Sequence, residues 1–590
     1  MNRDREEAHD GGVMRQGRRF MNLALGFTIL VVTAGMSASA QQTQRYWITL
    51  RDRGSHTTLS KLNAQDLGIS EHALWRRAKV LPPDRLIDEL DLPVDQSYLD
   101  QLRASGVTIR STSRWFNAVS AELTPDQQAT VASLPCVASV GPVAVFIRRD
   151  PQGTTTRADV TPSLQKGASS TDLNYGPSLT QLTNIKVVDV HNLGINGSGV
   201  VIGMLDDGFN NHTVHPALKN IKVIAEHDFV QGDSNTSVAP GEYSSQGFHG
   251  ETTLSTIGGY DSGKLIGVAY GASFILAKTE VDSTETRVEE DYWVSGLEWE
   301  ERLGAEIVTS SLGYNIFDDG TRYTFQNMDG RTATTSKAAR IAARKGVLVV
   351  NAMGNEYHSQ PGTLIVPADA DSIISVGAVY SDGTIAGFSS VGPTSDGRTK
   401  PEVMAQGVNV YVASGTGNYG SSSGTSYATP LTAGVAALVL SAHPTWTPMQ
   451  VRDRMTQTAK PLYDSSAGMK THPNNYFGWG MVDALNAVGK FGPGSIPTEF
   501  ALYHNYPNPF NGSTTILVDA PTDQEMDLSV FNLLGQKVCS LYKGRSTPGV
   551  NTFYWRDGLD DANNRVATGI YICRLSVAGT VFSQKIVYLK

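Results

Sequence analysis

The sequence predicts an α/β fold built on a parallel sheet, preceded by a small α+β unit and followed by an antiparallel β-sandwich. Between about residues 180 and 490, nearly continuous apolar runs alternate with segments of helical periodicity. Apolar strands between helices indicate a parallel sheet that is covered on both faces. Residues 45–147 mix short helices with alternating strands, whereas 498–590 hold short strands separated by Gly, Pro, Asn and Asp. A chain of 590 residues is too long for one hydrophobic core, so several domains are expected.

The composition is that of a folded protein, with 40% hydrophobic and 18% charged residues. The formal net charge of −9 is modest and gives no basic footprint, which argues against nucleic acid as a partner. The three cysteines are Cys136, Cys539 and Cys573, and no CxxC pair predicts a zinc site. Cys539 and Cys573 are either a disulfide, in an oxidising compartment, or two free core thiols.

The N-terminal segment has the pattern of a secretory signal peptide. Arginines within residues 15–19 precede an apolar run from Met21 to Met36, and an Ala-Ser-Ala exit follows at residues 38–40. The apolar run is shorter than the roughly 20 residues that a transmembrane helix needs. We therefore expect residues 1–40 to be removed and the mature protein to have no transmembrane anchor; an uncleaved membrane anchor is the alternative. The acids before Met14 are unusual for a signal peptide, so Met14 is a second candidate start.

The elements of the α+β unit come first along the chain. Proline at the first helical position supports the second helix, and alternation supports the strands. The predicted strands are Tyr46–Leu50, Phe116–Leu123 and Val137–Val143, and the predicted helices are Ser97–Leu102 and Pro125–Ser133. Residues 150–175 then lose all periodicity and are rich in Thr, Ser, Gly, Gln and Asp, which predicts an exposed linker.

The α/β region and the C-terminal region follow. The predicted α/β strands are Gly199–Leu205, Phe274–Lys278, Glu306–Ser310 and Val347–Ala352, with helices at Thr252–Gly258, Val288–Leu303, Ser336–Lys345 and Leu431–Leu440. After a linker at Pro493–Pro497, the predicted strands are Ile516–Val518, Leu528–Leu533, Lys537–Leu541, Val550–Trp555, Ile570–Val577 and Phe582–Leu589.

Ser426 lies between Gly424-Thr425, which permits a turn, and the apolar helix Leu431–Leu440. This places a hydroxyl at a helix N-terminus. A serine hydroxyl is a poor nucleophile unless a base, an orienting acid and an oxyanion donor lie nearby. Three further motifs supply such groups at strand ends or helix entries, where open parallel sheets hold their sites. They contain Asp206, His249 and Asn355.

The order Asp, His, Asn, Ser and the residues around each resemble the subtilase family of serine peptidases. The resemblance covers about residues 180–490 and implies a triad of Asp206, His249 and Ser426, with Asn355 as an oxyanion donor. Asp207 is an alternative orienting acid, and it replaces the commoner Ser or Thr. His212 and His215 lack the glycine that follows a family histidine, so we predict that they are loop residues.

Ser311, Leu312 and Gly313 resemble the family's substrate-binding segment, whose exposed backbone pairs with an extended peptide. A glycine there would allow close approach. The chemistry requires no cofactor. Structural calcium is common in the family, but no ligand cluster is evident, since Asp318 and Asp319 have the pattern of a solvated loop. No metal site is predicted.

The flanking regions carry two further resemblances. Residues 45–147, chiefly Trp115–Val119 through Val140, are similar to the inhibitory propeptides of subtilases, although Leu59–Leu92 is longer than the usual pattern. This implies that the chain's own propeptide inhibits it until cleavage within 148–178. The last region resembles the sorting domain of type IX secretion, whose marks are Asn505–Asn511, Leu534–Val538, Gly569–Tyr571 and Lys585–Lys590. A plain β-sandwich binding module is the alternative.

The expected organisation is a signal peptide at 1–40, a propeptide and linker at 41–165, a peptidase domain at 166–493 and a sorting domain at 498–590. The expected function is that of a self-processing zymogen of a secreted or cell-surface serine endopeptidase, exported through the periplasm of a Gram-negative-type bacterium. Its partners would be protein or peptide substrates, its propeptide and the secretion machinery. The rival hypotheses are an idle binding protein with the same fold and a processing protease of narrow specificity.

Overall fold

The computed structural model describes residues 44–56, 63–142, 173–358, 360–463, 471–489 and 500–589, except 503–504, 506–509, 511 and 513. The predicted signal peptide, most of the linker after the α+β unit, and part of the Asn505–Asn511 motif lie outside the described residues.

The α+β unit is an antiparallel sheet of order β2-β3-β1-β4 with two helices. The strands are β1 (Gln44–Leu50), β2 (Thr108–Ser113), β3 (Ala118–Leu123) and β4 (Val137–Pro142), and the helices are α2 (Gln96–Ala104) and α3 (Pro125–Ala132). The side chain of Thr124 caps α3, so the predicted helix start is confirmed. The sequence missed β2, whose residues TIRSTS are mostly polar, and α1 (Glu71–Arg77), whose last turn buries two arginines.

The central sheet has seven parallel strands in the order β13-β12-β11-β10-β5-β9-β6. They are β13 (Val403–Gln406), β12 (Ile374–Val379), β11 (Leu348–Ala352), β10 (Ile307–Ser310), β5 (Val201–Asp206), β9 (Ser273–Lys278) and β6 (Lys222–Asp228). The four predicted strands are confirmed as the middle of this sheet. The missed β6 is a half-exposed edge strand with charged residues, and β13 is only four residues long. The missed β12 is a buried apolar run that the pattern could have revealed.

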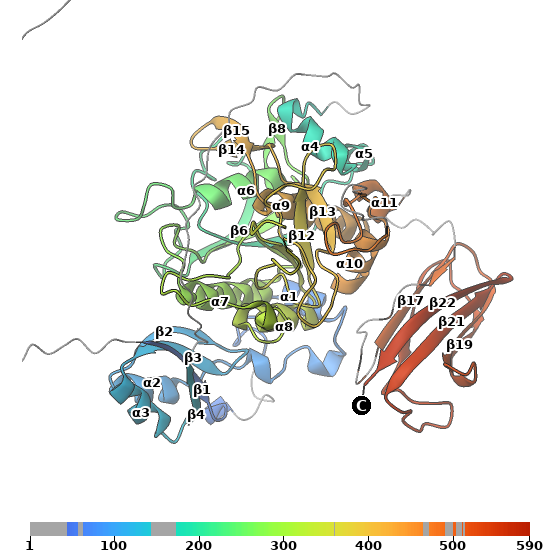
Figure 1. The fold of residues 1–590 in the computed structure, drawn as a ribbon, viewed down its shortest axis with the longest axis horizontal. Helices are drawn as coiled ribbons and strands as arrows, with labels where there is room; N and C mark the ends of the chain where they lie inside the picture. Colours follow the sequence, from blue (N-terminus) through green and yellow to red (C-terminus); the bar gives the residue numbers. More distant parts are fainter. Residues whose placement is uncertain are drawn as a thin grey trace, which may run out of the picture. The chain divides into compact units, whose positions relative to one another are not determined.

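Helices cover both faces of the sheet, as predicted (Figure 1). α6 (Phe248–Gly258) and α9 (Thr425–Ala442) pack with Ile202 and Met204 on one face. α7 (Arg287–Leu303) and α8 (Thr334–Arg344) pack with Val201 and Leu205 on the other. Within the described residues, α9 alone is long and apolar enough to cross a bilayer, but it is 94% buried. It is therefore a core helix of this domain.

The remaining elements of this domain are short. They are the hairpin β14 (Val410–Ser414) and β15 (Asn418–Ser422), the pair β7 (Tyr260–Asp261) and β8 (Leu265–Ile266), and the helices α4 (Leu179–Asn184), α5 (Val187–His191), α10 (Pro448–Gln457) and α11 (Ala484–Val488).

The C-terminal region is an antiparallel β-sandwich, as predicted. One sheet has the order β16-β17-β20 and the other β19-β18-β21-β22. The strands are β16 (Ala501–Leu502), β17 (Thr514–Ala520), β18 (Glu525–Asn532), β19 (Lys537–Arg545), β20 (Gly549–Trp555), β21 (Gly569–Val577) and β22 (Thr580–Tyr588). Cys539 on β19 and Cys573 on β21 both pair with Val530 of the intervening β18. The intervening strand keeps them apart, and both are free, buried thiols, which decides between the two alternatives.

Candidate active site

The motifs singled out in the sequence meet at the carboxyl edge of the parallel sheet. Asp206 is the last residue of β5, Ser311 follows β10, and Asn355 comes three residues after β11. Because β10 lies between β5 and β11 in parallel register, the ends of the three strands are neighbours. This is the edge at which open α/β sheets bind their ligands.

Asp206 and His249 are joined by a hydrogen bond of 2.6 Å between Oδ1 and Nδ1. The second carboxylate oxygen of Asp206 accepts from Thr253 Oγ1 at 3.0 Å, so the carboxylate is held at both oxygens. Asp206 is buried, whereas the His249 side chain is 30% exposed, which leaves the imidazole accessible from one side. Burial favours the neutral ring, but the charge and hydrogen bond of Asp206 outweigh it and raise the pKa of His249 above its usual value.

Asp207 has a different set of partners. Its carboxylate accepts from the backbone N–H groups of Gly247 (3.1 Å), His249 (3.3 Å) and Gly250 (2.8 Å). These N–H groups belong to the start of α6, which leaves its first donors without helical partners. Asp207 therefore caps the helix that carries His249, while Asp206 contacts the imidazole itself. Burial, together with repulsion from Asp206, raises the pKa of Asp207 to about 7.

The position after His249 requires glycine for a steric reason. A Cβ atom at Gly250 would lie 2.0 Å from the carbonyl oxygen of Gly208 and 2.9 Å from Cβ of Asp206. Only glycine permits this approach. The His-Gly pair thus brings the first turn of α6 against the end of β5.

Ser426 is the second residue of α9, at its N-terminus. Its hydroxyl donates to the carbonyl oxygen of Ser311 at 3.2 Å, and the Ser311 hydroxyl donates to the carbonyl oxygen of Ser426 at 2.8 Å. The Ser426 hydroxyl is thus hydrogen-bonded to the residue that follows β10. The next residue links the two helices, because Tyr427 lies with its ring centroid 6.0 Å from that of His249 and its hydroxyl 3.2 Å from Thr252 Oγ1.

Asn355 is held in one orientation by Thr425. Its amide oxygen accepts from the backbone N–H (3.0 Å) and the hydroxyl (3.1 Å) of Thr425. A Cβ atom built on Gly424 would lie 3.7 Å from both Nδ2 of Asn355 and Cβ of Ser426, so the amide nitrogen and the serine side chain border the same space at Gly424. With Oδ1 occupied, Nδ2 is the end of the amide that can donate to a bound molecule.

The segment Ser311–Gly313 lies next to Ser426, as its position after β10 requires. The carbonyl of Leu312 accepts from Nδ2 of the buried Asn351 at 3.0 Å, a support that the sequence reasoning missed although Asn351 stands in the Asn355 motif. A Cβ atom at Gly313 would lie 2.4 Å from Ile365. Internal packing therefore gives one reason for this glycine, and the close approach of a substrate stays a prediction.

His212, His215, Asp318 and Asp319 each form a hydrogen bond with a backbone group. Nδ1 of His212 bonds to the carbonyl of Phe209 (2.7 Å), and Nε2 of His215 bonds to the carbonyl of Asn418 (3.0 Å), which agrees with their prediction as loop residues. Asp318 accepts from the backbone N–H of Glu285 (2.9 Å), and Asp319 accepts from that of Thr321 in its own loop (2.8 Å).

Asp206, Asp207 and His249 could each offer a metal ligand atom within 4.8 Å of the others. The oxygens of both carboxylates, however, already accept from N–H and O–H donors. Carboxylate oxygens that already accept hydrogen bonds from N–H and O–H groups are poorly placed to bind a cation as well, so these three residues fit a hydrogen-bonded network better than a metal site.

Comparison with protein families assigns all three structured regions. Residues 197–480 match the subtilase family, residues 45–157 match the peptidase S8 propeptide domain of Bacteroidota, and residues 504–589 match the secretion system C-terminal sorting domain. The sorting domain indicates a secreted or cell-surface protein exported by type IX secretion.

Several subtilisins are similar to the chain. Subtilisin NAT of Bacillus subtilis subsp. natto is 33% identical over 311 residues, which cover 52% of this chain and 70% of that protein. Subtilisin DY of Bacillus licheniformis is 34% identical over 310 residues, covering 52% of this chain and 96% of that protein. Among solved structures, the prenylagaramide maturation protease PagA gives a TM-score of 0.40 at 23% identity, over 51% of this chain and 96% of that chain. On the family match and the identity to the subtilisins, the chain belongs to the subtilase family and is a subtilisin-like serine endopeptidase.

Proposed function

We propose that this chain is the zymogen of a secreted serine endopeptidase that uses Asp206, His249 and Ser426 and cleaves its own propeptide. The observation that carries the proposal is the 2.6 Å bond from His249 to Asp206, at the sheet edge near which Ser426 lies in the first turn of α9. An acid that orients a histidine beside a serine at a helix N-terminus is the arrangement that activates a hydroxyl.

The reaction follows from the protons and bonds involved. Ser426 Oγ attacks the scissile carbonyl carbon while its proton passes to Nε2 of His249. Asp206 holds the Nδ1–H and stabilises the resulting imidazolium. The imidazolium then protonates the leaving amine as the C–N bond breaks, which leaves an acyl group on Ser426. Water, deprotonated by His249, releases the acid and restores the enzyme.

The negative oxygen of the tetrahedral intermediate would be stabilised by Nδ2 of Asn355 and the backbone N–H of Ser426. The orientation that Thr425 imposes on Asn355 supports this role, since it leaves Nδ2 available. The start of α9 adds the favourable partial charge of a helix N-terminus. An extended substrate would pair with the backbone of Ser311, Leu312 and Gly313.

The chain's own propeptide would be its inhibitor until cleavage. Contacts between β2 or β3 and α7 support this: Glu298 accepts from Ser113 Oγ and the N–H of Arg114, and Asp291 accepts from Ser120 Oγ. We assign 1–40 to the signal peptide, 41–165 to the propeptide and linker, 166–493 to the peptidase domain and 498–590 to the domain that contacts the secretion machinery, with the cut within 148–178.

The proposal is tested by covalent labelling. A fluorophosphonate should react with Ser426 in the mature enzyme, because only an activated serine attacks phosphorus at a useful rate. Peptide mass spectrometry locates the adduct. Ser441 is the internal control, since it is a serine at the other end of the same helix whose hydroxyl donates to the carbonyl oxygen of Ser198. An adduct on Ser441 as readily as on Ser426, or equal labelling of unfolded protein, would contradict the proposal.

Replacing Asn355 with Ala should lower kcat by about 10²–10³-fold, the loss that removal of one such donor causes in a subtilisin. KM should change little, because the donor acts on charge that develops in the transition state. Steady-state kinetics on a chromogenic peptide measure both constants. Asn235→Ala, in an exposed loop of the same domain, is the control. A rise in KM with unchanged kcat would argue against the assigned role.

A further inference from the structure

The propeptide contacts the peptidase domain a second time through α1, at the C-terminal ends of α7 and α8. The guanidinium of Arg76 donates to the carbonyl oxygens of Glu301 (2.8 Å), Ala305 (2.7 Å) and Lys345 (3.2 Å). The last carbonyls of a helix lack partners within it and attract positive charge. Arg76 thus serves as a cap for two helices of the other domain.

Ser70, which precedes α1 and caps it, adds to the same contact. The N–H of Ser70 donates to the carbonyl of Arg302, and its hydroxyl donates to the carbonyl of Leu303, both at 2.9 Å. Gly304, which ends α7 in the left-handed conformation, leaves room for this approach, because a Cβ there would lie 3.1 Å from the Ser70 hydroxyl. Donors of α1 therefore occupy several consecutive carbonyls at the end of α7.

Beside these bonds lies a buried network of charges. Arg77 forms two bonds with the carboxylate of Glu301 (2.8 and 2.7 Å) and two with that of Asp91 (2.8 and 2.9 Å). Lys345 donates to Asp91 at 3.1 Å. Arg77 and Glu301 are both 0% exposed. Burial opposes ionisation of Glu301, but the two arginines hold its pKa below the usual value. Without Arg77, Glu301 would keep only Arg76 as a cationic partner and Asp91 only Lys345. Leaving buried carboxylates with less compensating charge is costly.

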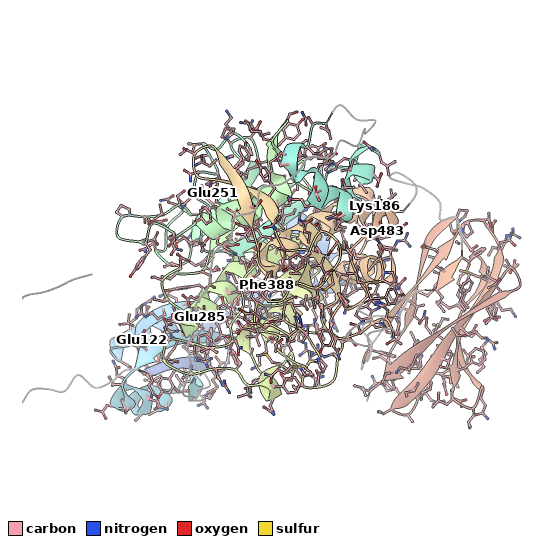
Figure 2. The ribbon with its side chains drawn as sticks, turned by 45° about the horizontal axis from the view of Figure 1, so that its top comes forward. Glu122, Lys186, Glu251, Glu285, Phe388 and Asp483 are labelled. Carbon is pink, nitrogen blue, oxygen red and sulfur yellow. The ribbon has the colours of Figure 1, made fainter. Side chains whose placement is uncertain are left out.

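The network differs from the surface ion pairs of the same unit. The side chains of Arg110 and Glu122, the latter labelled in Figure 2, are 42% and 34% exposed. Exposed pairs of this kind contribute little to stability.

This second contact lies away from the candidate active site. Glu306, which binds Lys79 of the α1 segment at 2.8 Å, precedes β10, whereas Ser311 follows it. Five residues of extended chain span about 16 Å. The contact is therefore at the amino edge of the sheet, and it does not depend on a peptide that occupies the catalytic edge.

We propose that α1 is an attachment of the propeptide independent of the active site, in which Arg76 and Arg77 hold the propeptide on the peptidase domain after the linker has been cut. Cleavage and release are then separate steps, and the rate of release is set at the ends of α7 and α8. This rests on the proposed function in one respect, namely that residues 41–165 are a propeptide that is cut from the peptidase domain.

The test uses the full chain with Ser426→Ala and a recognition site for an added protease inserted between residues 150 and 165. The chain cannot cut itself, so attachment is measured separately from its activity. After the added protease has acted, the chain is diluted, and size exclusion at successive times measures how much propeptide still co-elutes with the peptidase domain. The compared variants are Arg77→Met, and Arg103→Met on α2, whose side chain is 52% exposed.

We expect Arg77→Met to release the propeptide about 100-fold faster than the parent chain, since truncating one partner of a buried charge pair acts mainly on dissociation. Arg103→Met should match the parent. The proposal is overturned if Arg77→Met and the parent release at the same rate, or if the parent loses its propeptide at once. If Arg77→Met does not fold, as judged by its thermal transition, Lys79→Met replaces it. If Lys79→Met releases the propeptide about 5–10-fold faster than the parent chain, the proposal is supported. If it releases the propeptide at the parent's rate, the proposal is overturned. If the cut Ser426→Ala parent retains its propeptide but the wild-type chain hydrolyses no substrate, the proposed function is refuted and the proposed attachment is not.

Discussion

Replacing Ser426 with Ala should abolish hydrolysis of an unstructured protein such as casein, with kcat reduced by about 10⁶-fold, the loss that removal of the nucleophile causes in a subtilisin. The physical reason is that Ala offers no atom to form the acyl-enzyme, so that binding and oxyanion stabilisation alone remain. The precursor should also stay intact between the propeptide and the peptidase domain, since self-cleavage uses the same hydroxyl. Gel analysis of the purified chain measures this directly.

The matched control is Ser441→Ala, which removes a hydroxyl from the exposed end of the same helix. It should cleave casein and mature like the wild type. Equal hydrolysis by Ser426→Ala and the wild type, or equal maturation without an added protease, would remove the central proposal. Adding a trace of wild-type enzyme to Ser426→Ala shows whether the cut can also be made between molecules.

Replacing Asp206 with Asn should lower kcat by about 10⁴-fold while leaving the fold intact. An amide can donate to Nδ1, which favours the wrong tautomer of His249, and it no longer stabilises the imidazolium. The pH profile gives a second readout. The pKa of His249 is raised by Asp206, and the reaction needs the neutral ring. In the wild type, kcat/KM should therefore rise with pH through a limb above the ordinary value of about 6.5. In Asp206→Asn, which lacks the carboxylate that raises the pKa of His249, the rise of kcat/KM with pH should occur at a lower pH than in the wild type.

Asp207→Asn separates the two adjacent acids. The asparagine retains an oxygen that can accept from the start of α6, so the loss should be about tenfold or less, against four orders of magnitude for Asp206→Asn. Kinetics of both variants on one peptide substrate decide the matter. A larger loss for Asp207→Asn would identify Asp207 as the orienting acid.

Much of the fold followed from the sequence because its signals are local. The four middle strands of the sheet are apolar on both faces, and α7 and α8 are periodic, so these elements were predicted within two residues of their observed bounds. The starts of α6 and α9 lie four and six residues before the predicted ones. Elements at the edges of the fold were not predicted, because they mix apolar residues with polar or charged ones. The edge strand β6 carries charged residues. Helix α1 buries Arg76 and Arg77, although arginine is among the most polar residues on hydrophobicity scales and is expected at the surface.

Short motifs by themselves determined that this chain is a subtilase, since Asp206, His249, Asn355 and Ser426 each stand in a segment of recognisable order. Only the tertiary structure decided what the neighbours of these residues do. The family motif favours Asp206 over its neighbour Asp207 but does not say what Asp207 does. In the structure, Asp206 contacts the imidazole of His249 and Asp207 caps the start of α6. Gly313 makes room for Ile365, and Arg77 finds its carboxylate 224 residues away. Such assignments depend on contacts between distant segments, which a local pattern does not contain.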